Sequence, residues 1–106
     1  MLDTTFSALA DPTRRAILEA LAGGGRSVGA LSEPFAISAP AISRHLNVLE
    51  AAGLITNTRY GKGRLCTLVP APLVAVRDWT DFQARFWSDS LDRLHDFVKQ
   101  EYPDRD

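Results

Sequence analysis

The residues best suited to chemistry lie between positions 38 and 64, where four basic side chains are set against one acidic side chain. The basic residues are Arg44, Arg59, Lys62 and Arg64. Arginine and lysine bind phosphate oxygens, and arginine is also the commonest donor to O6 and N7 of guanine. This region therefore predicts contact with an anionic partner, and with nucleic acid in particular.

Groups that could catalyse a reaction are sparse. The chain contains two His and one Cys. His45 and His95 fall on different predicted helices, so no nucleophile, base and orienting group are expected to share a cleft. One Cys also excludes a disulfide framework and a Cys-rich zinc site. We therefore expect no enzyme activity and no cofactor.

Length and composition place the chain among globular proteins. Its 106 residues, 45% hydrophobic and 24% charged, predict a single domain over residues 1–106. No apolar run approaches the roughly 18 residues that a membrane span needs, and no secretory signal is recognisable. We therefore expect a soluble cytoplasmic protein that does not bind membranes.

The net charge of −1 conceals two halves of opposite sign. Residues 1–70 contain seven Lys and Arg against five Asp and Glu, whereas residues 71–106 contain five against eight. A local basic surface matters more for binding an anion than the sum over the chain. The anionic partner is therefore expected on the first part of the chain.

Three short helices are predicted before the basic region. The first covers residues 3–9. The second begins with Asp11 as N-cap and Pro12 at the first helical position, and three glycines at 23–25 end it. The third covers residues 27–35 and begins at a serine.

A fourth helix over about residues 38–52 carries the first part of the basic region. Ser38 suits its N-cap and Gly53 its C-terminal stop. One face of the helical wheel is mainly apolar and contains Ile42, His45, Leu46, Leu49 and Ala52. The opposite face is small, polar and basic and contains Pro40, Ser43, Arg44, Asn47 and Ala51. Because His45 lies on the apolar side, we expect a structural role rather than a DNA contact.

A β-hairpin over about residues 54–69 carries the second part. LITNTRY and RLCTLVP are rich in β-branched and apolar residues, and a Gly-Lys-Gly turn at 61–63 joins them. Alternation leaves the exposure of Cys66 open. With no second Cys for a redox pair, we expect a packing role for this thiol.

A long helix over about residues 73–101 has more apolar surface than one neighbour can cover. Its apolar residues occupy about half of the helical wheel, whereas a helix packed on one partner needs a stripe of only about 100°. A second copy of the chain is the simplest cover. A small-molecule pocket at the seam is the alternative, and the two can coexist. The proposed contact residues are Trp79, Phe82, Phe86, Trp87 and Leu94.

These elements in this order predict a mostly α fold with a small β-hairpin, a winged helix-turn-helix with a long C-terminal helix. Such folds place one helix in the major groove of double-stranded DNA and the wing on the flanking backbone or minor groove. The expected contacts are Ser38, Ala39, Pro40, Ser43 and Arg44 on the helix, and Arg59, Lys62 and Arg64 on the wing. The alternative for Ser43 and Arg44 is an exposed helix surface without a partner, and the alternative function is a protein-interaction module that does not bind specific DNA.

Arg14 and Arg15 are interpreted as part of a solvated helix face, and contact with phosphate is the second interpretation.

Three segments, ADPTRRAILEAL, SAPAISRHLNVLEAAGLI and RYGKGRLCTL, resemble the ArsR family of bacterial winged-helix repressors. The likeness is close over residues 6–69 and continues into the last helix. It implies a homodimer paired through the first and last helices, which adds Phe6 to the interface. It also implies repression at an imperfect inverted repeat, relieved by an effector that the sequence does not identify.

The chain departs from the metal-sensing members of that family. Those sensors carry a Cys-x-Cys motif before the recognition helix, where this chain has SVGALSEPF, or a ligand set with two His on the last helix. Here the last helix offers Asp92 and His95 with no second His. A tight site needs three or four ligands. We therefore expect no metal.

Overall fold

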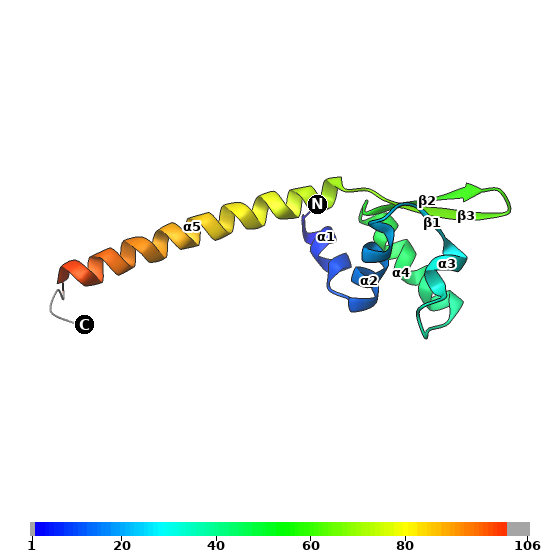
Figure 1. The fold of residues 1–106 in the computed structure, drawn as a ribbon, viewed down its shortest axis with the longest axis horizontal. Helices are drawn as coiled ribbons and strands as arrows, with labels where there is room; N and C mark the ends of the chain where they lie inside the picture. The colour runs from blue at the N-terminus through cyan, green and yellow to red at the C-terminus, as the bar shows by residue number, and fades with distance from the viewer. Residues whose placement is uncertain (1, 102–106) are drawn as a thin grey trace. The chain divides into compact units, whose positions relative to one another are not determined.

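The fold is taken from a computed structural model in which residues 2–101 are described (Figure 1). The elements in chain order are α1 (Leu2–Leu9), α2 (Pro12–Leu21), β1 (Arg26–Ser27), α3 (Val28–Ser32), α4 (Ala39–Ala51), β2 (Ile55–Tyr60), β3 (Gly63–Leu68) and α5 (Ala71–Glu101). Two compact units are present, one ending at Ala75 and the other beginning at Val76. The mostly helical winged helix-turn-helix expected from the sequence is confirmed.

Helix α2 begins where the sequence predicts. The Asp11 carboxylate accepts hydrogen bonds from the backbone N–H of Thr13 at 2.8 Å and of Arg14 at 3.1 Å. These bonds satisfy two of the N–H groups that a helix start leaves without partners. Pro12 follows at the first helical position, where its missing N–H costs nothing.

Helix α3 is shorter than the predicted segment 27–35. Ser27 caps it by accepting a hydrogen bond from Ala30 N–H, as predicted, but the helix ends at Ser32. Pro34 has no N–H to continue the helical ladder, so the chain leaves the helix before it. Phe35 still packs against the core from the turn that follows.

Helix α4 confirms both predicted ends. The Ser38 hydroxyl accepts a hydrogen bond from Ala41 N–H at 3.3 Å. At the other end Gly53 has a φ of +74°, Leu54 N–H donates to Leu49 C=O, and Gly53 N–H donates to Glu50 C=O. This pair of bonds is a Schellman motif, in which a glycine adopts the left-handed conformation that ends the helix.

The sheet has one strand more than the predicted hairpin. Its order is β1-β3-β2, with both pairs antiparallel. Strand β1 pairs Arg26 with Cys66 and Ser27 with Leu65. Two residues carry no alternation pattern, so β1 could not be recognised without the edge of β3 that it binds. The hairpin of β2 and β3 extends beyond α3 and α4 (Figure 1).

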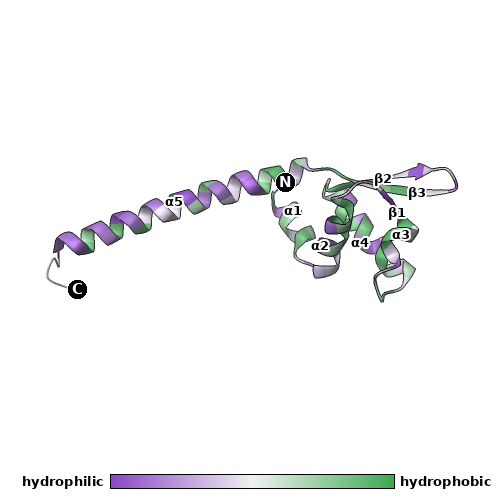
Figure 2. Cartoon of the chain, in the orientation of Figure 1, coloured by the Kyte–Doolittle hydropathy of each residue, from purple (hydrophilic) through white to green (hydrophobic). Residues whose placement is uncertain are grey.

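A single apolar core lies among α1–α4 and the base of the sheet. Its buried hydrophobic residues are Ala8, Ile17, Leu18, Leu21, Leu31, Ile42, Leu46, Leu49, Leu54, Ile55 and Cys66. Cys66 is 0% exposed, which settles the alternative that the sequence left open: its side chain packs in the core. Figure 2 shows hydrophobic residues on the elements that surround this core.

Helix α5 begins at Ala71, two residues before the predicted start. Pro72 lies in its first turn, where no N–H is required. The first turn contributes Leu73 to the core. None of its described residues is buried, and Figure 2 shows hydrophobic and hydrophilic residues alternating along it. Beyond its first turn, the exposed large apolar residues of α5, here called the apolar stripe, are Trp79, Phe82, Phe86, Trp87, Leu91, Leu94, Phe97 and Val98.

Candidate nucleic-acid interface

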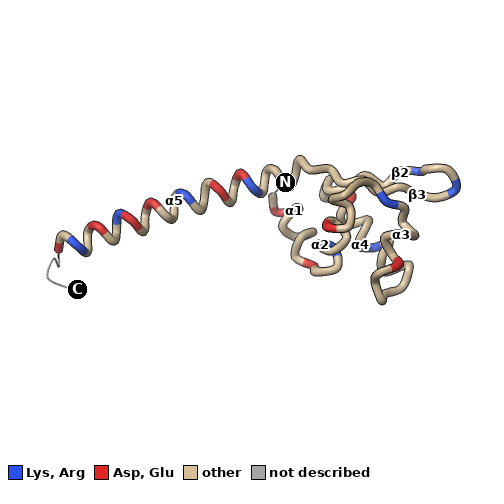
Figure 3. Tube along the Cα trace, in the orientation of Figure 1, with Lys and Arg blue, Asp and Glu red and all other residues tan. Residues whose placement is uncertain are grey.

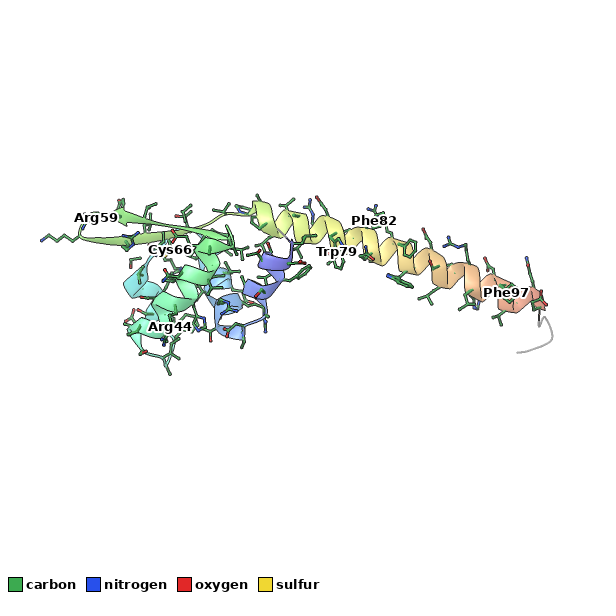
Figure 4. All side chains as sticks on the ribbon, turned by 180° about the vertical axis from the view of Figure 1, so that it is seen from behind. Arg44, Arg59, Cys66, Trp79, Phe82 and Phe97 are labelled. Carbon is green, nitrogen blue, oxygen red and sulfur yellow. The ribbon has the colours of Figure 1, made fainter. Side chains whose placement is uncertain are left out.

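Helix α4 is anchored by one face and exposed on the other. Ile42, Leu46 and Leu49 are buried in the core, whereas Ser43 and Arg44 are exposed. Within residues 2–101 the Arg44 guanidinium forms no hydrogen bond or ion pair. All its hydrogen-bond donors are therefore available to a partner, and the packed helix fixes the position from which the Arg44 side chain extends (Figure 4).

The first turn of α4 has only short side chains, so a partner can approach its backbone closely. Ser38, Ala39 and Pro40 are all exposed and have short side chains. The hydroxyl of Ser38 already accepts the capping bond from Ala41, so its remaining capacity toward a partner is mainly as a donor. This turn can lie against a phosphate backbone or a base edge without steric obstruction.

The hairpin ends in a two-residue turn that exposes a lysine. Gly61 has a φ of +59° and no other residue of the turn has a positive φ, as in a type II′ turn with glycine first. Lys62 stands at this turn and, like Arg59, forms no hydrogen bond or ion pair within the described residues. Basic residues mark the outer part of the hairpin in Figure 3, and Figure 4 labels Arg59 on this part of it.

Arg64 differs from the other basic residues of the hairpin because it is held in place. Its Nε donates to Asn57 Oδ1 at 2.9 Å, and its Nη2 donates to the Asn57 main-chain oxygen at 2.8 Å. The sequence did not identify Asn57 as a residue of the expected DNA-binding site. The antiparallel register could have identified it, because pairing Arg59 with Arg64 sets Asn57 diagonally across from Arg64.

A cleft of about 240 Å³ separates α4 from the hairpin. Its walls are formed by Val28, Ser43, Leu46, Asn47, Glu50, Asn57 and Arg64. The expected residues Ser43 and Arg64 thus share one cleft although they come from different elements. Asn47 and Asn57 are further polar groups in its wall, each with an amide that can donate and accept.

Known proteins are similar to this chain in sequence and in fold. Residues 9–58 match a family described as a helix-turn-helix domain. The chain is 41% identical over 102 residues to the HTH-type transcriptional regulator Rv2034 of Mycobacterium tuberculosis, covering 96% of this chain and 92% of that protein. The crystal structure of an ArsR family transcriptional regulator has 38% identity and a TM-score of 0.78, covering 82% of this chain and 96% of that one.

The chain belongs to the ArsR family of winged helix-turn-helix transcriptional regulators. A third relative is the transcriptional repressor SdpR of Bacillus subtilis, which is 46% identical over 61 residues, covering 58% of this chain and 68% of that protein. These relatives are regulators of transcription rather than enzymes. The family resemblance stated from the sequence is therefore confirmed.

In this ArsR-family regulator, Arg14 and Arg15 have a role that neither sequence interpretation anticipated. Arg14 donates from Nε to Ala8 C=O at 2.6 Å and from Nη2 to Ser7 C=O at 3.1 Å, while Arg15 donates from Nη1 to Leu9 C=O at 2.7 Å. Both arginines therefore donate to carbonyls in the last turn of α1, where a helix runs out of N–H donors for its carbonyl groups. The reading of Arg14 as a solvated face was wrong, because its guanidinium is committed to the chain.

His45 lies at the edge of the core, as expected. It is half-buried, and its Nδ1 lies 3.4 Å from Arg14 Nη1. The regulator thus links the end of α1 to α4 through Arg14, with His45 as the contact on α4. This arrangement accounts for a histidine on the apolar side of α4.

Among residues 2–101, no three His, Cys, Asp or Glu side chains are grouped so as to hold a metal ion. No helix in this part of the chain is long and apolar enough to cross a membrane.

At Cys66, burial raises the pKa of the thiol, and the Glu50 carboxylate acts in the same direction.

Proposed function

We propose that this ArsR-family regulator represses transcription as a homodimer bound to an imperfect inverted repeat near its own or a neighbouring gene. The observation that carries the proposal is the pairing of an uncommitted Arg44 on the exposed face of α4 with uncommitted Arg59 and Lys62 on the hairpin. A helix in the major groove and a basic wing on flanking DNA need these groups free.

The proposed contacts sort into two chemical roles. Ser43 and Arg44 project from the middle of α4 and would read base edges, with Arg44 paired to guanine. The first turn of α4 and the wing would hold the phosphate backbone and so fix the register of the helix on the duplex. The residues in the second role are Ser38, Ala39, Pro40, Arg59, Lys62 and Arg64.

The homodimer is supported by the apolar stripe of α5. Phe86 is 48% exposed and Trp87 60% exposed, and their rings meet edge to face at 5.4 Å between centroids. Several large aromatic groups on one exposed helix mark an interaction surface. We propose Trp79, Phe82, Phe86, Trp87 and Leu94 as its main contacts, and the family resemblance adds Phe6 of α1 to the dimer interface.

Relief of repression would follow from population shift. A ligand that binds better to a dimer geometry unfit for DNA lowers the affinity for the operator by the ratio of its two affinities. A tight metal site needs at least three protein ligands, and residues 2–101 contain no such group. We therefore propose a ligand other than a metal ion.

The test is binding to DNA measured by fluorescence anisotropy over a salt series, with chelator present. The probe is a duplex selected by the wild-type protein from genomic fragments, called here the selected duplex, and the control is a scrambled duplex of equal length. We expect selective binding that weakens steeply with salt, because several phosphate contacts each release counterions. Equal and weak binding to both duplexes would instead favour a protein-interaction module.

A further inference from the structure

We infer that Asn57 is a positioning residue, which holds the Arg64 guanidinium in one orientation so that its remaining donors meet DNA already aligned. The inference rests on the proposed function, because it assigns a role to Arg64 in DNA binding. It goes further by adding a residue that does not itself need to touch the duplex.

The two hydrogen bonds fix both the position and the plane of the guanidinium. Nε donates to the Asn57 side-chain oxygen at 2.9 Å and Nη2 to the Asn57 main-chain oxygen at 2.8 Å. A planar group held at two nitrogens cannot rotate about its last bonds without breaking one of them. Of the five donors of an arginine, two are used and three remain for a partner.

The strand register places this held group toward the recognition helix. Asn57 pairs with Cys66 and Arg59 with Arg64, so all four side chains lie on one face of the hairpin. That face buries Cys66 at its base, and further out its Asn57 and Arg64 form one wall of the cleft against α4. Arg64 is thus fixed on the same cleft as Ser43 of the recognition helix.

The charge of Arg64 argues against a purely structural brace. Arg59 lies directly opposite, and like charges across an antiparallel pair oppose pairing of the strands. A neutral side chain could bridge β2 and β3 without that penalty. An anionic partner removes it, because phosphate oxygens bind both guanidinium groups. Holding one arginine in advance also lowers the ordering cost that binding otherwise imposes on a long side chain.

The experiment is a double-mutant cycle on the selected duplex, with wild type, Asn57→Ala, Arg64→Ala and the double variant. We expect Asn57→Ala to weaken binding about three- to tenfold, as for loss of one orienting hydrogen bond, while the salt slope stays unchanged. In the Arg64→Ala background the same substitution should change affinity less than twofold, because its only effect is through Arg64. Thr56→Ala, on the exposed opposite face of the same strand, is the matched control.

A second measurement needs no DNA. In the free protein, ¹⁵N relaxation at side-chain Nε should show Arg64 ordered and Arg59 mobile on the picosecond-to-nanosecond timescale. Asn57→Ala should raise the mobility of Arg64 toward that of Arg59, because only the hydrogen bond from Nη2 to the main-chain oxygen of residue 57 remains, with thermal unfolding confirming that the variant remains folded. Equal mobility of Arg59 and Arg64 in wild type would overturn the inference.

The outcomes separate this inference from the proposed function. If Arg64→Ala weakens binding but Asn57→Ala does not, positioning is wrong and DNA binding stands. If Asn57→Ala lowers the affinity for the selected duplex by the same factor in the Arg64→Ala background as in wild type, Asn57 acts on the fold rather than on Arg64, and the inference is again wrong. If wild type selects no duplex, the proposed function fails and the positioning role falls with it.

Discussion

Arg59 and Arg64 lie directly opposite each other on β2 and β3, on the exposed outer part of the hairpin. Two like charges at this spacing destabilise a strand pair. Arg64 is drawn toward Asn57, whereas Arg59 has no partner within residues 2–101. The hairpin therefore carries a charge arrangement that weakens the free protein and suits it to an anion.

Replacing Arg59 should separate stability from binding. We expect Arg59→Thr to leave the free energy of unfolding unchanged or raise it by less than about 1 kcal/mol, because the repulsion is removed and threonine favours strands. Affinity for DNA should fall, and the slope of log K against log salt should decrease by about one phosphate contact. Denaturant unfolding and the anisotropy salt series measure the two effects. A destabilised hairpin with unchanged affinity would contradict the proposed role of Arg59.

Arg44→Ala should reduce specific binding more than non-specific binding. Loss of a bidentate contact to guanine costs roughly 1–3 kcal/mol and relaxes the preference at one base pair. Because Arg44 is exposed and has no intrachain partner among the described residues, unfolding should hardly change. The measurement is anisotropy on the selected and scrambled duplexes. Arg85→Ala, which removes an exposed arginine from α5, is the control, and unchanged affinity for the selected duplex would refute the assignment of Arg44.

Much of the fold could be predicted because local signals agree with tertiary contacts. Ser38 and Gly53 define α4 from sequence, and the structure uses them as N-cap and left-handed stop. Gly61 likewise predicts the hairpin turn. The helical wheel predicts opposite faces for Ile42 and Arg44, and in the structure Ile42 is buried and Arg44 is exposed. The prediction succeeds because 3.6-residue periodicity on a packed helix is a strong signal.

The parts that could not be predicted depend on contacts between distant segments. Strand β1 exists only because β3 offers an edge, and two residues have no pattern of their own. The bonds of Arg14 to Ser7 and Ala8 depend on how α1 meets α2. The hold of Asn57 on Arg64 depends on strand register. The sequence shows that these arginines are present, but only the helix packing and the strand register show which of them form hydrogen bonds within the chain.

Phe86→Asp should convert the proposed dimer to a monomer. An aspartate in the centre of an apolar interface would be buried without a partner, which costs several kcal/mol. Light scattering over a concentration series measures the change. Ser88→Asp introduces the same side chain on the polar side of α5 and should leave the mass unchanged. A Phe86→Asp protein that still dimerises would place the interface elsewhere.

Cys66 should be inert in the native protein. Burial raises the pKa of its thiol, so little thiolate forms at neutral pH, and the side chain is 0% exposed. A thiol reagent such as DTNB should therefore react slowly with the folded regulator and rapidly in denaturant. Fast reaction without denaturant would show that this region of the sheet opens, and would revive a redox role.

Asp11 should make the stability of α2 depend on acid pH. Hydrogen bonds from the backbone N–H of Arg14 and Thr13 hold the pKa of the Asp11 carboxyl below its ordinary value of 3.8. A pKa lowered by folding gives stability that is fully present above the unfolded value and is lost as pH falls through the folded value. Asp11→Ala should therefore lower the free energy of unfolding at neutral pH, and the difference from wild type should shrink as pH falls below 3.8. Asp11→Asn is the matched control, because asparagine caps a helix about as well without titrating. Denaturant melts across this pH range measure all three proteins, and a constant Asp11→Ala deficit at every pH would show that the carboxylate charge does not contribute.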